Sequence, residues 1–401
     1  MAISMTKLKA GWLARAGACT LAATLAACGG GSHHGGHPPP PPQPAGLTYD
    51  VIPLTLGGPG TAYYVGRKGI NAKGQVAGSI DVPGGLEHAF LYDGTRMNDL
   101  GTLDGELAQA FAINALGQVA GTAVLRREDG STRAFFYDGT MRNLGTLGGK
   151  ESTGFDLNDR GQVTGDSTGT DRVRRAFLYQ DGVMAPLPTP GLGSSSGRAI
   201  NNSGTVAGIY QGPNDTNRGF IVGACRCAKD LGTLGGNETY VAAINDAGQV
   251  TGGSQVPSGG LHAFRYENGV IRDLGTLGGD YSQAFSINAS GWTTGNSRTS
   301  TGLPHAFVHD GTVMRDLGTL GSGGAEANVI NASGQVVGAS FTSTGEQHAM
   351  TWTEAGGMVD LNKVLHNPPP GLLLTNAYTV SDNGSIVAQA NPGLVLLRPR
   401  K

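Results

Sequence analysis

The sequence predicts an all-β protein, a β-propeller of four-stranded blades, and three observations support this prediction. A short motif, Ile or Leu followed by Asn, two variable residues and Gly, occurs seven times, and a weaker eighth copy begins at Val380-Ser381. Successive motif glycines lie 43, 44, 43, 44, 43, 43 and 50 residues apart. A repeat in the low forties that contains short strand-like segments is typical of propeller blades. No long segment has the apolar period of a helix.

Each repeat contains four strand-like segments joined by two kinds of tight turn. In the sixth repeat the segments are 284–287, a stretch from 292 onward, 305–308 and 315–320. Asn at the first and Gly at the fourth position suit a type I turn, because the Asn side chain can bond the backbone two residues on. Asp-Gly or Asn-Gly supplies the positive φ angles of a tight hairpin. These pairs recur at Asp93-Gly94, Asp138-Gly139, Asp181-Gly182 and Asn268-Gly269.

The order of the strand types predicts how the ring closes. The fourth strand of the repeat reads Asp-Leu-Gly-Thr-Leu or a variant of it, and one such strand stands alone at 50–56. The C-terminus ends with the other three strands of a unit, around 378–380, 386–388 and 394–397. An unpaired edge strand invites aggregation. We therefore predict eight blades, closed by pairing of the N- and C-terminal strands; the alternative is seven blades with a degenerate terminal segment.

The repeated motifs resemble the extracellular HAF repeat family of bacteria. The resemblance is carried by His-Ala-Phe at 88–90, 262–264 and 305–307, with Asp-Leu-Gly-Thr-Leu-Gly-Gly and Asn-x-x-Gly-Gln-Val, and it spans residues 47–399. The sequence departs from the pattern where Arg replaces His, at Arg133, Arg175 and Arg218, and where Met350 replaces Phe. The resemblance implies an exported repeat domain and its fold, and no particular chemistry.

Residues 1–27 are expected to be a lipoprotein-type signal peptide. Lys7, Lys9 and Arg15 precede an apolar run over 16–25, which is too short for a permanent bilayer span. The run ends in Leu-Ala-Ala-Cys28-Gly, which resembles a bacterial lipobox, so Cys28 is expected to be lipidated. The alternative is an ordinary signal peptide cleaved after a small residue. The lipoprotein interpretation predicts a location in the cell envelope, at the outer membrane or cell surface, with the membrane bound through the lipid.

Residues 28–46 are expected to form a tether that separates the anchor from the propeller at 47–401. Glycine, serine and histidine come first, then prolines at 38–42 and 44. A proline stretch of this kind is semi-rigid at ~3.1 Å per residue. His33, His34 and His37 could bind a transition metal weakly, but a solvated linker is the favoured interpretation. No metal site and no cofactor is predicted.

Two cysteines, Cys225 and Cys227, remain after loss of Cys19 and lipidation of Cys28. An oxidising envelope favours a disulfide between them, and free thiols are the alternative. A metal site would need two further ligands that the neighbouring sequence does not offer. The recurring histidines at 88, 262, 305 and 348 occupy one position of one strand type, where Arg also occurs. A structural hydrogen bond within each blade is favoured there over a ring of metal ligands.

Composition and motifs exclude several classes of function. The net charge is −2 and there is no Lys/Arg stripe, so nucleic-acid binding has no electrostatic basis. The string Gly165-Asp-Ser-Thr-Gly169 matches the nucleophile-elbow pattern, but it lies inside a β repeat rather than on a strand-to-helix turn. No catalytic residue is therefore predicted.

The favoured function is a non-catalytic binding or scaffold propeller, monomeric, with an unknown protein or glycan ligand. The alternative is an envelope enzyme, a glycan hydrolase or lyase, with its site at the central channel; two carboxylates about 5–9.5 Å apart in one pocket would indicate it. The blade crossovers place acids and tyrosines at similar positions around the channel mouth. These candidate ligand-binding residues are Glu106, Glu151, Glu238, Tyr240, Asp280, Tyr281 and Glu326. They predict a shallow acidic, partly aromatic funnel for a cation, a basic peptide or a sugar, and the alternative is a set of solvated loop charges.

Overall fold

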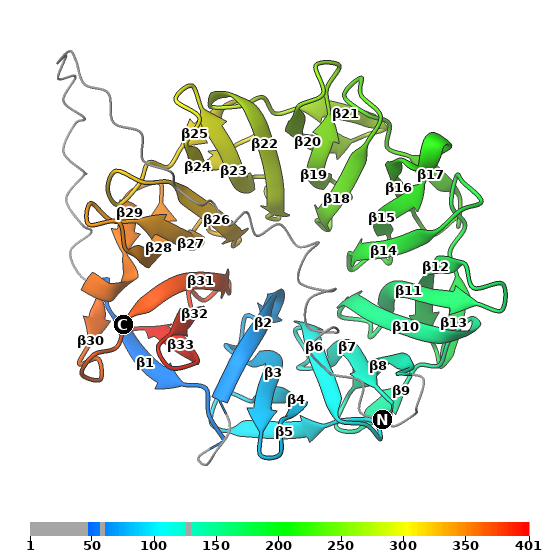
Figure 1. The fold of residues 1–401 in the computed structure, drawn as a ribbon, viewed down its shortest axis with the longest axis horizontal. Helices are drawn as coiled ribbons and strands as arrows, with labels where there is room; N and C mark the ends of the chain where they lie inside the picture. Colours follow the sequence, from blue (N-terminus) through cyan, green and yellow to red (C-terminus); the bar gives the residue numbers. More distant parts are fainter. Residues whose placement is uncertain (1–46, 57–60, 126–129, 401) are drawn as a thin grey trace, which may run out of the picture. The chain divides into compact units, whose positions relative to one another are not determined.

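The computed structural model describes residues 47–56, 61–125 and 130–400. These residues form β-strands and two short 3₁₀ turns, η2 (Pro213–Asp215) and η3 (Leu361–Lys363), with no α-helix in the described part of the chain. The all-β prediction is confirmed. The sheets stand around a common axis like blades (Figure 1). The predicted signal peptide, Cys28 and the tether lie outside the described residues.

Each blade is an antiparallel meander, and its first two strands lie nearest the axis (Figure 1). The first strands are β2 (Thr61–Ile70), β6 (Leu107–Ile113), β10 (Gly148–Leu157), β14 (Ser195–Ile200), β18 (Thr239–Ile244), β22 (Gly278–Ile287), β26 (Ala325–Ile330) and β31 (Leu374–Val380). The second strands are β3 (Val76–Val82), β7 (Val119–Val124), β11 (Val163–Gly169), β15 (Val206–Gln211), β19 (Val250–Gln255), β23 (Thr293–Thr299), β27 (Val336–Phe341) and β32 (Ile386–Ala390).

The outer two strands of each blade complete the sheets. The third strands are β4 (Leu86–Tyr92), β8 (Thr132–Tyr137), β12 (Arg174–Gln180), β16 (Asn217–Val222), β20 (Leu261–Glu267), β24 (Pro304–His309), β28 (Gln347–Thr353) and β33 (Leu394–Pro399). The fourth strands are β5 (Met97–Gly101), β9 (Met141–Asn143), β13 (Val183–Pro186), β17 (Ala228–Asp230), β21 (Val270–Asp273), β25 (Met314–Asp316), β29 (Gly357–Asp360) and β1 (Tyr49–Pro53).

The N-terminal strand β1 belongs to the same sheet as the C-terminal strands. It pairs antiparallel with β33 over five residues, from Tyr49 opposite Pro399 to Pro53 opposite Val395. Its other edge is covered in parallel by the two-residue strand β30 (Leu365–His366). The order β30-β1-β33-β32-β31 is therefore the one sheet of the described residues that joins both ends of the propeller.

The Asn-x-x-Gly motif forms the turn between the first and second strands. In the first copy the Gly74 amide donates to the Asn71 carbonyl at 2.9 Å, and Gly74 has a φ of 76°. The Asn71 side chain accepts from the Lys73 amide at 3.0 Å and the Gln75 amide at 3.1 Å. This is a type I turn followed by a left-handed glycine, as the motif predicted.

The Asp-Gly turns are of two kinds, and the sequence prediction describes only one. Asp181-Gly182 and Asn268-Gly269 have positive φ at both residues, as in a two-residue hairpin. At Asp93-Gly94 only the glycine has positive φ. There the Asp93 carboxylate accepts from the Thr95 and Arg96 amides, both at 2.9 Å, and this longer turn needs no left-handed aspartate.

A glycine that faces a large buried side chain accounts for much of the packing within each regular blade. This side chain is phenylalanine except opposite Gly338, where it is Met350. Phe135 is fully buried on the third strand and faces Gly121 on the second. A Cβ atom at Gly121 would lie 1.9 Å from the Gln109 carbonyl oxygen of the first strand and 2.8 Å from the Phe135 ring. Glycine therefore lets the ring pack over the backbone. The same position is held by Gly78, Gly121, Gly165, Gly208, Gly252, Gly295 and Gly338.

The motif asparagines also join each blade to the next, through what we call the asparagine belt. The Asn71 amide nitrogen donates to the Asn114 carbonyl at 3.0 Å, and Asn114 donates to the Asn158 carbonyl at 3.0 Å. The series continues from Asn158 to Asn201, Asn245, Asn288, Asn331 and the carbonyl of Ser381, at 2.9–3.1 Å. Each asparagine is at least 93% buried, with Asn245 the most exposed at 7%, so these bonds are protected from water.

Candidate functional site at the ring axis

The predicted acids lie where the chain enters the first strands, but most of them are engaged within their own blade. Glu151 accepts from Arg174 at 2.6 Å, and the same guanidinium bonds Asp166 at 2.6 Å. Asp280 accepts from Arg298 at 3.2 Å. For Glu106, which immediately precedes β6, the structure gives a backbone contact: its carbonyl accepts from the Glu87 amide at 3.0 Å.

The predicted tyrosines contact these acids or their partners. Tyr240 donates its hydroxyl to Glu238 at 2.8 Å. Tyr281 donates to Gln283 at 2.7 Å, and the Arg298 guanidinium lies 5.7 Å from its ring centroid. These contacts stay within one blade or reach only its neighbour, so the seven predicted residues are held as separate local groups.

Glu326 differs from the other predicted acids because the charged group that affects it belongs to another blade. Burial raises its pKa, and the nearby Arg67 guanidinium partly offsets this effect. Glu326 belongs to β26 and Arg67 to β2, so the two charges approach from different blades.

The recurring histidines are structural. The Nδ1 atom of His88 lies 2.9 Å from Asp99, that of His262 lies 2.8 Å from Asp273, and that of His305 lies 2.8 Å from Asp316. In each case the aspartate is on the fourth strand of the same blade. Arg218 makes the equivalent contact with Asp230 at 2.8 Å. The predicted hydrogen bond is confirmed for the histidines and for Arg218. Arg175 instead pairs with Asp171, and Arg133 donates to the Thr132 and Lys150 carbonyls.

Cys225 and Cys227 are free, exposed thiols in the structure, so the disulfide expected from the sequence is not formed in it. The Cys227 amide instead donates to the Cys225 sulfur at 3.3 Å, and the Cys227 thiol donates to the Cys225 carbonyl at 3.4 Å. The neighbouring thiol and amide of Cys227 lower the pKa of Cys225. A bond across a single intervening residue closes a very small ring, which disulfide geometry accommodates poorly.

The first strands carry a cluster of arginines and aromatic rings that was not predicted from the sequence. We call Tyr64, Arg67, Phe111, Phe155, Arg198 and Phe285 the axis cluster. The Tyr64 and Phe111 rings meet edge to face with centroids 6.1 Å apart, and Phe111 and Phe155 are also 6.1 Å apart. The Arg198 guanidinium lies over Phe155 at 4.9 Å, and that of Arg67 lies over Phe285 at 4.6 Å.

These contacts form one continuous series around the axis. From Arg198 on β14 it passes through Phe155 on β10, Phe111 on β6 and Tyr64 on β2. Arg67, on the same strand as Tyr64, then continues it to Phe285 on β22. The innermost strands of these blades face one another in Figure 1. The series therefore spans five blades, with an arginine near either end.

The two arginines are unusual because they are solvent-accessible and yet have no anionic partner in contact. Within the described residues, neither guanidinium makes a side-chain hydrogen bond or an ion pair. Surrounding protein removes part of their hydration, and this desolvation lowers the pKa of both groups. By contrast, Lys68 beside Arg67 is paired with Asp156 at 2.6 Å.

A signal for this cluster was present in the repeat. The residue two positions before the Ile or Leu of each motif lies on the first strand, next to buried neighbours. In five repeats this residue is large and aromatic or is an arginine: Phe111, Phe155, Arg198, Phe285 and Tyr378. Aligning the repeats by their motif would have revealed this position.

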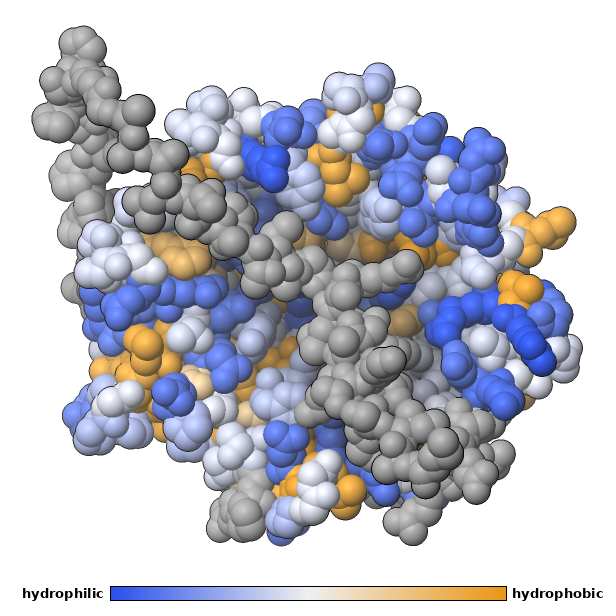
Figure 2. All heavy atoms as spheres, viewed as in Figure 1, coloured by the Kyte–Doolittle hydropathy of each residue, from blue (hydrophilic) through white to orange (hydrophobic). Residues whose placement is uncertain are grey.

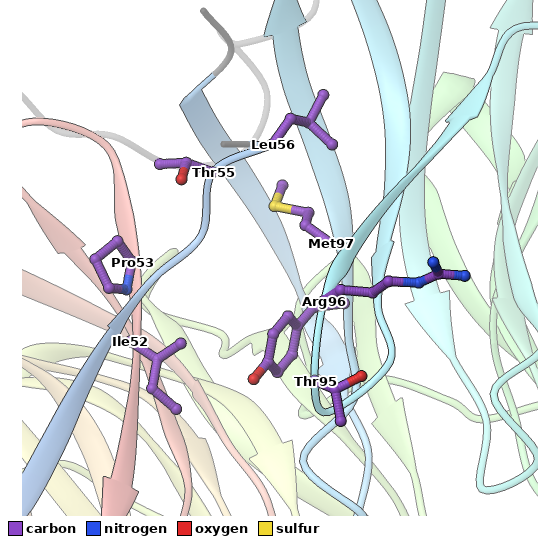
Figure 3. Close-up of a pocket in the computed structure, with 8 residues that line it drawn as sticks. Ile52, Pro53, Thr55, Leu56, Thr95, Arg96 and Met97 are labelled. Atoms are coloured by element: carbon purple, nitrogen blue, oxygen red, sulfur yellow. The ribbon is translucent and has the colours of Figure 1, made fainter. Parts of the chain in front are cut away.

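Two pockets lie at the rim, away from this cluster. One, of about 300 Å³, lies between β1 and the turn into β5, and Figure 3 shows its lining side chains. It is lined by Ile52, Pro53, Thr55, Leu56, Tyr92, Thr95, Arg96 and Met97. The other, of about 350 Å³, contains the ion-paired Asp171 and Arg175. Hydrophobic residues occur in small separate groups on the face shown in Figure 2.

Two further features of the described residues bear on function. No group of three or more histidine, cysteine or acidic side chains there is placed to hold a metal ion. Nor do residues 47–56, 61–125 and 130–400 form a helix with the length and apolar character needed to cross a bilayer.

No protein-family model and no curated protein matches the chain. Among solved structures, the chain is similar to a prolyl endopeptidase, with a TM-score of 0.52 and 10% identity over 85% of this chain and 54% of that one. It is also similar to a puromycin-hydrolyzing peptidase of Mycobacterium tuberculosis, with a TM-score of 0.46 and 13% identity over 81% of this chain and 57% of that one. A third similar structure is a TolB protein from Acinetobacter baumannii, with a TM-score of 0.37 and 12% identity over 79% of this chain and 76% of that one.

The chain spans little more than half the length of the two peptidases, and identities this low carry the fold alone. The resemblance to the HAF repeat family continues to rest on the motifs themselves. Together with the arrangement of the sheets, the likeness to the prolyl endopeptidase shows that the described residues form a β-propeller.

Proposed function

We propose that this chain is a non-catalytic binding protein of the cell envelope, with its ligand site at the ring axis. The observation that carries the proposal is the axis cluster, in which two accessible arginines without an anionic partner flank a series of aromatic rings. Aromatic side chains combined with a few placed polar or charged groups are the usual composition of a ligand site.

Contacts in the third blade count against the alternative of a glycan hydrolase. Arg174 occupies the space between the Glu151 and Asp166 carboxylates and bonds both at 2.6 Å. Asp166 also accepts from the Ser196 hydroxyl at 2.8 Å. Two carboxylates bound by the same guanidinium are poorly placed to donate a proton to a leaving group or to attack a sugar.

Ser167, the serine of the elbow-like string, is equally engaged. It is fully buried on β11, donates to the Glu151 carbonyl at 3.0 Å and accepts from the Leu147 amide at 2.9 Å. It therefore acts as a structural hydroxyl between strands, and a nucleophile at this position would have no access to substrate.

The proposal includes an eight-bladed ring closed by both ends of the chain. It is supported by the five-residue pairing of β1 with β33. The Asn383 side chain supplies a further bond, donating to the Ala72 carbonyl at 2.9 Å across this last seam. A seven-bladed ring would leave one of these meanders outside the circle.

The proposal also includes a lipid anchor at Cys28, supported by the lipobox-like sequence. Cys28→Ala should move the full-length protein from the membrane to the soluble fraction, because multiple acyl chains are what hold such a protein stably to a bilayer. Cys225→Ala is the matched control and should stay with membranes. If Cys28→Ala remains membrane-bound after a high-salt wash, the anchor proposal fails.

The acidic residues at the blade crossovers remain a second candidate surface, for a sugar or a basic peptide. Tyr240 paired with Glu238 offers an aromatic face beside a carboxylate, as protein–sugar contacts often do. Changing Glu151, Glu238 and Asp280 together to amides tests this surface and leaves the axis cluster intact.

To test the axis site, full-length variants of the protein are cross-linked in the cell envelope, and the ligand that each variant captures is compared with that of the wild type. Full-length protein with Arg67→Ala and Arg198→Ala should lose the captured ligand, while Arg96→Ala should retain it, since Arg96 lies at the rim with a side chain that is 79% exposed. Capture that survives the axis change but is lost in the triple amide variant would move the site to the crossovers.

A further inference from the structure

The arrangement of charge around the axis indicates what kind of ligand fits there. Arg67 and Arg198 belong to β2 and β14, and the rings of Tyr64, Phe111 and Phe155 lie between them along the contact series. A guanidinium stacked on a ring keeps its edge free, and that planar edge matches a carboxylate in two parallel hydrogen bonds. The cluster thus offers two anion sites separated by aromatic surface.

The aromatic rings between the arginines add a second requirement. Phe111 and Phe155 are partly exposed, whereas the residues on either side of each, such as Ala110 and Ala112, are buried. Their rings therefore line the accessible side of the first strands. An aromatic ring of this kind packs well against a ligand with a face of apolar C–H groups, such as a pyranose.

The partial desolvation of the two arginines increases the preference of this site for an anionic ligand. The two guanidinium groups have lost part of their hydration. The carboxylates near them, Glu326 for Arg67 and Asp166 for Arg198, form no hydrogen bond or ion pair with them within the described residues. A cation in such surroundings gains more from an anion than it would in open water. Glu326 supplies one negative charge near Arg67, but the structure gives no hydrogen bond between them.

We propose that the axis cluster binds an acidic oligosaccharide whose uronic acid carboxylates pair with Arg67 and Arg198 while its sugar rings pack against Phe111 and Phe155. This inference rests on the proposed axis site and adds the class of ligand. A uronate oligosaccharide carries one carboxylate per ring, so its charges repeat along a chain of sugar rings that each present C–H groups. An inorganic anion would use the arginines but not the aromatic surface.

The test is calorimetric titration of the full-length detergent-solubilised protein with an oligogalacturonate and with its methyl ester. The ester has the same rings without the charge. The wild type should bind the acid and should bind the ester at least roughly tenfold more weakly, because each charged hydrogen-bonded pair contributes that much or more. Binding of the acid should also weaken as salt is added.

Variants separate the contributions of charge and ring. Arg67→Gln or Arg198→Gln should each weaken binding of the acid by roughly tenfold to a hundredfold and leave binding of the ester unchanged. Phe155→Leu should weaken both ligands. Glu326→Gln should strengthen binding of the acid, since it removes the one carboxylate placed near Arg67. Arg96→Gln at the rim is the matched control and should change nothing.

The outcomes distinguish the two proposals. Equal binding of acid and ester, with loss in Phe155→Leu, overturns the acidic ligand but retains the axis site. Binding of the acid that is unaffected by both arginine changes overturns both. No binding of either saccharide overturns the inference about the ligand, and capture from the envelope by the same variants then decides the axis site independently.

Discussion

The blades joined by the asparagine belt and the sheet that contains both chain ends are held to their neighbours by different means. At a regular seam, a buried asparagine such as Asn201 shapes its own turn and donates to the next blade at 3.1 Å. Where the sheet of the chain ends meets the first blade, which we call the closing seam, Ser381 occupies that position. The bonds to the first blade come instead from the exposed Asn383 side chain, to the Ala72 carbonyl at 2.9 Å, and from the Thr379 hydroxyl, to the Arg67 carbonyl at 2.7 Å. The closing sheet relies more on apolar packing around Tyr49, Leu374 and Leu397.

The two regions also differ in how the second strand faces the third. In a regular blade a glycine faces a large side chain, as Gly121 faces Phe135. In the closing sheet Ala388 faces Val395. In the closing sheet, the second strand has a larger residue, alanine in place of glycine, and the third strand has a smaller one, valine in place of phenylalanine. The closing sheet therefore packs without the glycine. The repeat motif therefore describes one solution to blade packing, and the chain ends use another.

Removing the closing strand should have the largest effect. Deletion of Tyr49–Pro53 takes away Tyr49, which is 1% exposed, and leaves the edge of β33 unpaired. Loss of one fully buried aromatic side chain alone costs about 3–5 kcal/mol. The variant should unfold at a much lower temperature and aggregate in size-exclusion chromatography. Truncation just before Leu47 is the control, and a wild-type melting curve for the deletion would place β1 outside the ring.

Changing the size of the second-strand residue should affect the stability of a regular blade and of the closing sheet differently. Gly121→Ala puts a Cβ atom 1.9 Å from the Gln109 carbonyl oxygen, so the backbone must move. Overpacking of this kind costs about 1–3 kcal/mol. The reverse change at the closing sheet, Ala388→Gly, removes a buried methyl and should cost about 1 kcal/mol. Denaturant titration measures both, and equal tolerance of Gly121→Ala would contradict the close approach.

The inter-blade bond can be isolated from the turn. Asn201→Asp keeps the oxygen that accepts from the Ser203 and Thr205 amides but removes the donor to the Asn245 carbonyl. An unsatisfied buried acceptor costs about 1–3 kcal/mol. Asn383→Ala, at the exposed closing seam, should cost less because water can replace the bond. If Asn383→Ala lowers the unfolding free energy more than Asn201→Asp does, the asparagine belt does not hold the blades more strongly than the closing seam.

The smallest expected effect concerns pH at a single regular blade. Burial lowers the pKa of His309, and its Nδ1 accepts from the Gly311 amide at 3.0 Å, which requires the neutral ring. The unfolded chain thus binds the proton more readily, and stability should fall as pH decreases through the ordinary histidine range near 6.5. His309→Tyr, which places there the residue found at Tyr92 and Tyr266, should flatten this part of the stability profile. An unchanged pH profile would rule out His309 as its source.

The sequence was sufficient for the features that repeat. Asn71 and Gly74 are constrained by the local geometry of one turn, and local geometry is what a motif records. The same holds for the contacts of His88 and His262 with the fourth strand of their own blade. The second role of the asparagines was missed because a bond from Asn71 to Asn114 joins positions in two different repeats.

The candidate site was harder to predict because it depends on what differs between repeats. Arg67 and Phe285 lie 218 residues apart in sequence and meet only because the ring brings β2 and β22 to one axis. The acids were more conspicuous in the sequence, but Glu151 and Asp280 have arginine partners, Arg174 and Arg298, in the variable parts of their own blades. The sequence shows where an acidic residue lies, but it does not show whether that residue is paired with an arginine or is accessible to a ligand.

The asparagine belt has a direction, since every side chain donates toward the C-terminal neighbour and every motif carbonyl receives from the N-terminal one. Any internal unit of 43 or 44 residues consequently offers an asparagine donor to the unit after it and a carbonyl acceptor to the unit before it. A tandem copy of one unit would therefore form the same hydrogen bonds with its neighbours on both sides. Growth of the gene by whole repeats would thus preserve every seam and change only the diameter at which the two ends must meet.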